Sequence, residues 1–309
     1  TSIDICSKNN LVKHFINILK LISMKTIVRA FTLFLVTFFV FVNVYGQKYE
    51  ANWQSLKQVS TPQWLQEGKF GIYTHWGPYA VHAYGSNTTW YSFSLYQDPE
   101  GEAREHFEKT FGELSKDYGY KDLIPLFTAD KFNADEWAEL FAKSGAKFAG
   151  PVAEHHDGFA MWDTKYSEWN AVKMGPKRDV VGELEKAIKK RGMKFVTAFH
   201  HAANWFFFPV HDKQYDTGDP KNSGLYGQYH MPGEMRNQEF INEWYDKIIE
   251  VIVKYGPDFI WFDFALDSLP EGYVKDFLAY YYNWADKNGK EVVVTYKDHD
   301  IIPGAGVRD

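Results

Sequence analysis

The chain has 309 residues, of which 45% are hydrophobic and 24% charged, so it is long enough to form one large globular domain. Its formal net charge of -6 offers no basic surface for a phosphate backbone, so nucleic acids are not expected as partners. The only cysteine is Cys6, which excludes a catalytic thiol, a disulfide framework and a cysteine metal site from the rest of the chain.

The N-terminal region has the pattern of a secretory signal peptide. A basic start at Met24 to Arg29 precedes an apolar run from Ala30 to Val44, and small residues before Gln47 suit cleavage. The apolar run is shorter than the roughly 20 residues that a membrane-spanning helix needs. We therefore expect a spurious leader at residues 1–23, a signal peptide at 24–46, and a secreted or periplasmic domain at 47–309 with no membrane contact after cleavage. An uncleaved single anchor is the alternative.

Five strand-like segments follow in chain order, each a short apolar or β-branched run bounded by turn residues. The first four end in polar side chains, which are costly to place beside buried strands unless they have a function. The first run, 70–74, is followed by His75-Trp76, and the second, 148–154, by His155-His156-Asp157. The third run, 194–199, is followed by His200-His201, and the fourth, 258–262, by Asp263. The fifth run is 292–296.

Apolar residues at helical spacing fill the intervals between these strands. Asn133 and Glu136 form a capping box before a stripe of Trp137, Leu140 and Phe141. Asp179 is expected to cap the next helix. The predicted helices cover residues 133–145, 179–192, 240–256 and 277–289.

This alternation of strands and helices predicts an α/β fold with a parallel sheet, and a (β/α)8-like TIM barrel in particular. Sites of such barrels lie at the carboxyl ends of the strands, where this chain has its polar residues. A flavodoxin-like or Rossmann sheet is the alternative, but no glycine-rich phosphate loop joins a strand to a helix. About five βα units are present where a barrel needs eight, so we expect an incomplete barrel. Long loops at residues 97–132 and 206–235 are expected to form walls of the site.

The strand ends surround one carboxylate, Asp263, with several imidazoles. Histidine and aspartate also bind zinc or iron, but no single element carries several ligands at a metal-binding spacing, so no metal is expected. Neutral hydrogen-bonding groups around one carboxylate better suit a polyhydroxylated ligand. Retaining glycosidases use one carboxylate as nucleophile and a second as acid/base. Asp263, which ends a buried strand, is the expected nucleophile.

Several motifs in the same order resemble those of glycoside hydrolase family 29, the α-L-fucosidases. The resemblance implies a (β/α)8-like catalytic domain that removes terminal α-L-fucose from fucosylated glycans by an exo-acting, retaining mechanism, and no cofactor is expected. It assigns the nucleophile to Asp263 and sugar contacts to His75, His155 and His156, with Trp90 as a pocket aromatic; Trp76 and His200 are further candidates. The motifs are residues 70–79, 83–86, 90–91, 155–159, 176–182 and 261–263.

The chain departs from the family pattern at three places. Glu154 replaces the lysine that usually precedes the paired histidines, the third strand ends in Phe199-His200-His201, and Phe264 follows Asp263 where a small residue is usual. These changes affect the predicted substrate contacts, in particular whether Phe199 or His200 reaches the sugar.

The acid/base is expected beyond residue 309, because in the family it follows the nucleophile strand at a variable position. The chain would then be truncated and inactive by itself. Asp267, Asp298 and Asp300 are the nearby carboxylates, and each is expected to be a solvated loop residue. The competing interpretation is a secreted carbohydrate-binding protein that keeps the pocket without hydrolysing; the oligomeric state is open.

Overall fold

A computed structural model of the protein describes His14, Asn17 and residues 47–309. The chain divides into two compact units, Thr1–Lys48 and Tyr49–Asp309, and the second contains all of the elements discussed below. Apart from His14 and Asn17, the predicted leader and signal peptide lie outside the described residues. Among the helices that are described, none combines the length and apolar character needed to cross a membrane.

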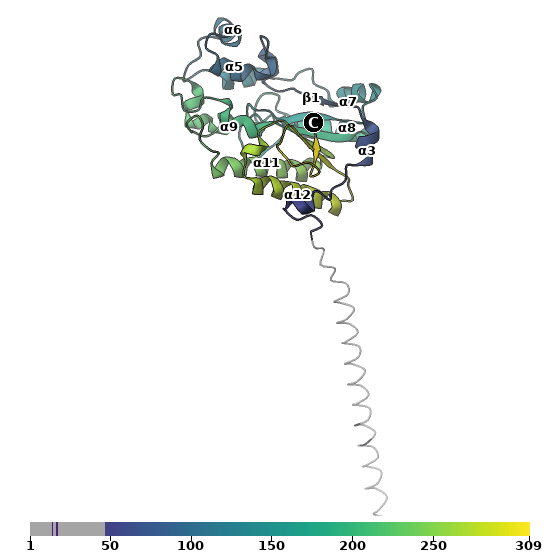
Figure 1. Cartoon of the computed structure of the whole chain (residues 1–309). Coiled ribbons are helices and arrows are strands. Elements are labelled where there is room, and N and C mark those ends of the chain that lie inside the picture. The colour runs from purple at the N-terminus through teal and green to yellow at the C-terminus, as the bar shows by residue number, and fades with distance from the viewer. Residues whose placement is uncertain (1–13, 15–16, 18–46) are drawn as a thin grey trace, which may run out of the picture. The chain divides into compact units, whose positions relative to one another are not determined.

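Six parallel strands form one sheet whose spatial order is the chain order (Figure 1). Each strand pairs in parallel with the next, as in the wall of a (β/α)8 barrel. Within residues 47–309 the first and last strands do not pair, so the sheet stays open and the prediction of a partial barrel is confirmed. The strands are β1 (Gly71–Thr74), β2 (Phe148–Glu154), β3 (Lys194–Phe199), β4 (Phe259–Phe262), β5 (Val293–Tyr296) and β6 (Val307–Arg308).

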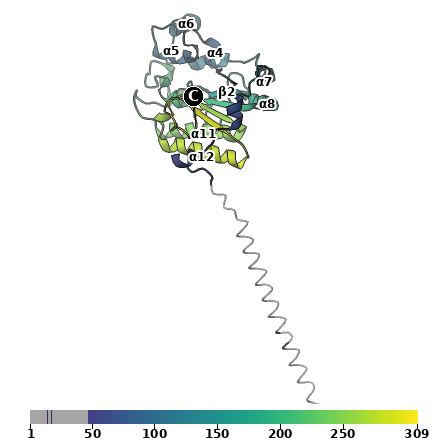
Figure 2. The same cartoon turned by 45° about the vertical axis from the view of Figure 1, so that its right-hand side comes forward.

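Four long helices connect the first five strands. Figure 2 shows α11 and α12 side by side below the sheet, with α7 and α8 together at another edge. These helices are α7 (Ala134–Lys143), α8 (Val180–Lys190), α11 (Gln238–Tyr255) and α12 (Glu271–Lys287). The large buried cluster between the helices and the sheet is the main core, because each helix turns one apolar stripe toward the strands.

A smaller apolar cluster lies on the concave side of the sheet. Val196, Phe259 and Val293 form its centre, and α3 (Gln63–Gly68) covers it with Trp64. The Trp64 ring meets the edge of the Phe148 ring at a centroid distance of 6.2 Å. This cluster occupies the place of a barrel interior and supports the strands from inside.

The two long loops lie together, although about 100 residues separate them. The buried Asp216 accepts hydrogen bonds from the hydroxyl groups of Tyr96, at 2.7 Å, and Tyr226, at 2.5 Å. The buried bond from Tyr96, which directly precedes the first loop, and the bond from the Lys121 N–H to the Tyr226 hydroxyl oxygen, at 2.7 Å, hold the two loops against each other. The short helices of this region are α4 (Tyr79–His82), α5 (Tyr91–Gln97), α6 (Glu102–Phe111), α9 (Asn204–Phe207) and α10 (Ser223–Tyr226).

The first predicted helix, α7, has the expected cap but a different buried stripe. The Asn133 side chain accepts the backbone N–H groups of Asp135 and Glu136, at 3.0 and 3.3 Å. Leu140, however, is 65% exposed, so its assignment to the buried stripe was wrong. The buried positions are Ala134, Ala138 and Phe141, and the small alanines let the helix approach α8 closely.

Asp179 caps α8, as predicted, and also connects α8 to α11. Its Oδ1 accepts the Gly182 N–H at 2.9 Å, and its Oδ2 accepts the Tyr255 hydroxyl at 2.8 Å. We expect Asp179→Ala to lower the free energy of unfolding by roughly 1–2 kcal/mol, measured by urea denaturation. Asp179→Asn keeps a capping oxygen and should lose less. Equal stability of the alanine variant and the wild type would contradict this role.

Candidate active site

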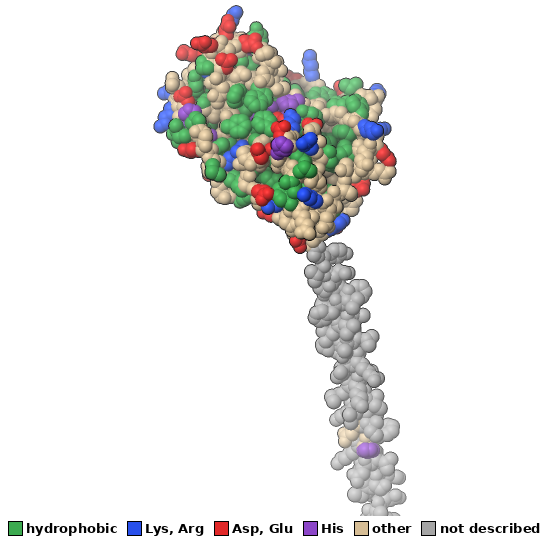
Figure 3. All heavy atoms as spheres, in the orientation of Figure 1, with side chains coloured by type: hydrophobic (Ala, Val, Ile, Leu, Met, Phe, Trp, Pro, Cys, Tyr) green, Lys and Arg blue, Asp and Glu red, His purple; other side chains and the backbone are tan. Residues whose placement is uncertain are grey.

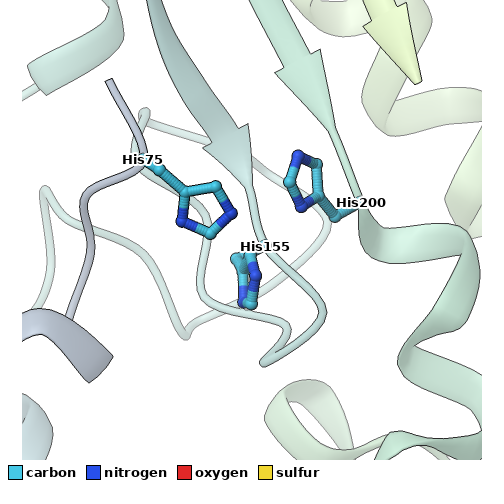
Figure 4. Close-up of side chains that lie close together, drawn as sticks. All are labelled: His75, His155 and His200. Carbon is cyan, nitrogen blue, oxygen red and sulfur yellow. The ribbon is translucent and has the colours of Figure 1, made fainter. Parts of the chain in front are cut away.

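Side chains from the carboxyl ends of neighbouring strands converge at one edge of the sheet. Figure 4 shows His75, His155 and His200, which follow β1, β2 and β3, pointing toward one another. Their ring centroids lie 4.7 to 5.0 Å apart. On the face seen in Figure 3, histidine side chains gather with acidic and basic ones beside hydrophobic side chains.

Both histidines of the pair after β2 reach this edge because the strand ends at Glu154, just after a bulge, and the chain turns there. Val152 pairs with Ala198 and Glu154 with Phe199, so β2 places one more residue than β3 over the same length. The strand then ends, and the rings of His155 and His156 lie 4.5 Å apart.

Asp263 follows β4 and lies among three nitrogen groups. Its carboxylate oxygens are 3.2 Å from His156 Nε2, 3.6 Å from His200 Nδ1 and 2.7 Å from Lys297 Nζ. Burial opposes ionisation, but the interactions with His156, His200 and Lys297 outweigh it and hold the pKa of Asp263 well below its usual range. Asp263 is therefore an anion at neutral pH, as a carboxylate nucleophile must be.

Three imidazoles near this anion, those of His75, His155 and His200, are neutral. Burial lowers the pKa of His75 to about 4, and it lowers the pKa of His155 and His200 well below the usual value. Both ring nitrogens of His155 and of His200 lack a hydrogen-bond partner within the described part of the chain. Unpartnered buried nitrogens are costly, and a ligand with several hydroxyl groups would satisfy them.

His156 and Asp157 are positioned by the surrounding chain. His156 Nδ1 lies 2.7 Å from the His200 carbonyl oxygen, which fixes the ring against Asp263. Asp157 is fully buried, and it accepts the Tyr120 hydroxyl at 2.7 Å and the Phe159 N–H at 3.2 Å. Asp157 therefore braces the turn after β2.

Trp90 lies at the site, whereas Trp76 does not. The Trp90 ring is 5.1 Å from His156 and stacks 6.1 Å from Phe264. Trp76 packs instead against Phe127 and Trp137, at centroid distances of 4.9 and 5.0 Å. Neighbours in extended chain point to opposite sides, so when His75 faces the site Trp76 faces away, and its assignment as a substrate contact is corrected.

The departures from the family pattern lie on both sides of the strands. Glu154 points away from the imidazoles and pairs with Lys247 of α11 at 2.8 Å. His200 reaches Asp263, while Phe199 is buried in the main core. His201 is buried on the other side of the strand end, and its Nε2 lies 3.3 Å from the Trp244 carbonyl oxygen.

Lys297 is the site residue that the sequence analysis missed. It follows β5 directly, so the rule that functional groups follow parallel strands could have found it. A lone lysine after a strand is a weaker signal than histidine or aspartate, because lysines are usually solvated.

Lys297 predicts a measurable change in the titration of Asp263. Lys297→Met should raise the pKa of Asp263, because it removes the cation 2.7 Å from the carboxylate. The ionised form, and any sugar binding or turnover that needs it, would then be lost at a higher pH as the solution is acidified. The carbon-13 chemical shift of the Asp263 carboxyl group, followed against pH, measures this. Lys297→Arg keeps the charge and is the control; an unchanged titration in Lys297→Met would contradict the pairing.

An open barrel sheet that places one ionised carboxylate among imidazoles and an indole at its strand ends fits the class of barrel glycoside hydrolases, whose sites lie at the same edge. Comparison with known proteins agrees. Residues 39–304 match the model of the α-L-fucosidase family, and the chain belongs to this family. It is 35% identical over 251 residues to the tissue α-L-fucosidase of Bos taurus, covering 80% of this chain and 48% of that protein. The human tissue enzyme is 32% identical over 253 residues, with 80% and 48% covered.

Solved structures give the same result. A Thermotoga maritima α-fucosidase crystallised in complex with fucose superposes with a TM-score of 0.66 at 32% identity, covering 82% of this chain and 57% of that one. A Bacteroides thetaiotaomicron α-L-fucosidase, at 20% identity and a TM-score of 0.51, shares the fold. The chain spans about half the length of the curated relatives it matches.

Proposed function

We propose that this chain carries the sugar pocket and the nucleophile of a retaining, exo-acting α-L-fucosidase that acts on fucosylated glycans. The observation that carries the proposal is the ionised Asp263, 3.2 Å from His156 and beside two neutral histidines without partners. Similarity to α-L-fucosidases of known structure supports fucose as the sugar.

Each group has a chemical role in this proposal. Asp263 attacks the anomeric carbon and forms the glycosyl-enzyme intermediate. His75, His155, His156 and His200 hydrogen-bond the sugar hydroxyls. The indole of Trp90, beside the Phe264 ring, offers an apolar surface to the sugar ring and its methyl group.

The mechanism also requires a second carboxylate as acid/base. Asp300 does not fit this role well, because its Oδ1 accepts the Asp267 N–H at 3.2 Å. It is buried rather than solvated, which corrects our expectation, and burial raises its pKa to about 6. None of the three carboxylates named from the sequence is therefore assigned as the acid/base.

Aryl glycosides test the function directly. A protein that carries this chain together with an acid/base should release the aryl group from an α-L-fucoside, and far less from the α-L-galactoside, which has a CH2OH group where fucose has a methyl group. Proton NMR should show the α anomer of fucose as the first product. Fucose binding measured by calorimetry without any turnover would favour the carbohydrate-binding interpretation, and an initial β anomer would contradict retention.

We also propose that the protein is exported after cleavage near Gly46. The basic start at Met24 and the apolar run up to Val44 support this. N-terminal sequencing of the mature protein tests it, and a mature protein that retains residues 24–46 would contradict cleavage.

A further inference from the structure

We propose that His75, His155 and His200 form a three-histidine binding site for a first-row transition metal ion, such as Zn²⁺, which excludes the sugar when it is bound. The metal-binding part stands on the geometry of the three side chains. The exclusion of the sugar rests on the proposed function.

The three side chains come from adjacent strand ends and already face one another (Figure 4). One ring nitrogen of each lies within 4.8 Å of those of the other two. Zn–N bonds of about 2.0–2.1 Å place tetrahedral ligand atoms about 3.4 Å apart, so each ring would move inward by less than about 1 Å. Side-chain rotation can supply such a movement without a change in the strands.

The nitrogens of this cluster are available. His155 and His200 are each only 2% exposed, and neither has a hydrogen-bond partner at either nitrogen among the residues that the structure describes. His75 Nδ1 lies 2.8 Å from the Tyr79 hydroxyl. When the hydroxyl oxygen accepts a hydrogen bond from His75 Nδ1–H, His75 Nε2 keeps its lone pair for a metal ion. Tyr79 then orients the His75 ring without binding the metal itself.

The donor set favours particular ions. Three imidazoles suit zinc, copper and nickel, whereas magnesium and calcium require oxygen ligands. His156, His200 and Asp263 form a second group of suitable spacing. Lys297 Nζ lies 2.7 Å from the Asp263 carboxylate in that group, so a cation there would meet an ammonium group. The three-histidine set does not include Asp263, so a metal there need not displace the Lys297–Asp263 pair.

Metal titration of the chain, purified without a histidine tag and treated with a chelator, tests the site. Calorimetry should show one Zn²⁺ per chain and no heat with Mg²⁺. Co²⁺ should give the intense visible absorption of a four-coordinate nitrogen site. His155→Gln and His200→Gln should each weaken Zn²⁺ binding at least about ten-fold, whereas His299→Gln, at an exposed loop residue outside the cluster, should bind as the wild type does.

Competition between Zn²⁺ and L-fucose distinguishes the metal site from the exclusion of the sugar. Saturating L-fucose should weaken Zn²⁺ binding, and Zn²⁺ should weaken fucose binding by the same factor. Absence of Zn²⁺ binding, or binding that both folded variants retain, overturns the metal site. Zn²⁺ binding that fucose does not affect, in a chain that binds fucose, overturns the exclusion. A chain that binds Zn²⁺ through these histidines but does not bind fucose supports the metal site and contradicts the proposed function.

Discussion

Asp263→Ala is expected to lower kcat for an activated aryl α-L-fucoside on the order of 10⁴-fold or more, in a protein that carries this chain. In the proposed mechanism, the substitution removes the oxygen that attacks the anomeric carbon, so the glycosyl-enzyme intermediate cannot form. His156→Ala should leave a slower enzyme with weaker transition-state binding, because it removes a neighbour of the carboxylate rather than the reacting atom. Asp267→Asn is the matched control and should retain activity.

Azide shows whether the lost group is the nucleophile. In Asp263→Ala, azide can occupy the space of the missing carboxylate and attack the same carbon, which restores part of the turnover and yields the inverted β-fucosyl azide. The configuration of the product, read by NMR, decides the matter. Normal hydrolysis by Asp263→Ala, or inversion by the unmutated protein, would mean that the nucleophile lies elsewhere or that the mechanism is not retaining.

Lys247→Met is expected to have the largest effect on stability, about 3–5 kcal/mol less free energy of unfolding. Lys247 Nζ lies 2.8 Å from both Glu154 and Glu243, and Lys247 and Glu154 are only 3% and 1% exposed. Removal of the lysine leaves the Glu154 carboxylate buried without its counter-charge directly behind His155. Urea denaturation at pH 8 measures the loss.

The pH dependence of this loss follows from Glu154. Burial raises its pKa to about 7 from the ordinary 4.5, and the attraction of Lys247 limits the rise. Because the folded state then holds a proton that the unfolded state releases, the contribution of Glu154 to stability falls as the pH rises from about 4.5 to 7. The lysine matters most when the carboxylate is ionised, so Lys247→Met should be less destabilising at pH 5 than at pH 8.

A double variant provides the control. Glu154→Gln with Lys247→Met removes both charges and should recover much of the stability, because the cost comes mainly from the unpaired charge. If Lys247→Met and the double variant were equally destabilised at pH 8, the loss would come from packing of the lysine stem instead.

The sequence predicted what depends on local pattern. The first five strands, their connecting helices and the Asp179 cap follow from apolar spacing and end signals within a few residues, and each is present. The two-residue strand β6 was missed because two residues show no period.

Side-chain direction was harder to predict. Trp76 and Leu140 are apolar residues whose neighbours in the sequence face the expected way, yet both turn elsewhere because partners distant in the chain decide which side is buried. Lys297 was missed for a related reason: only the fold brings the end of β5 next to Asp263.

The way in which β2 ends matters for any attempt to build this site into another protein. The motif His155-His156 on a regular strand would present one ring to each side of the sheet, whereas here the strand ends at Glu154 and the chain turns, with the Gly158 N–H 3.2 Å from the His155 carbonyl oxygen, so both rings lie at the same edge. A scaffold that carries His155 and His156 within a regular strand would therefore place only one of the two rings at the site.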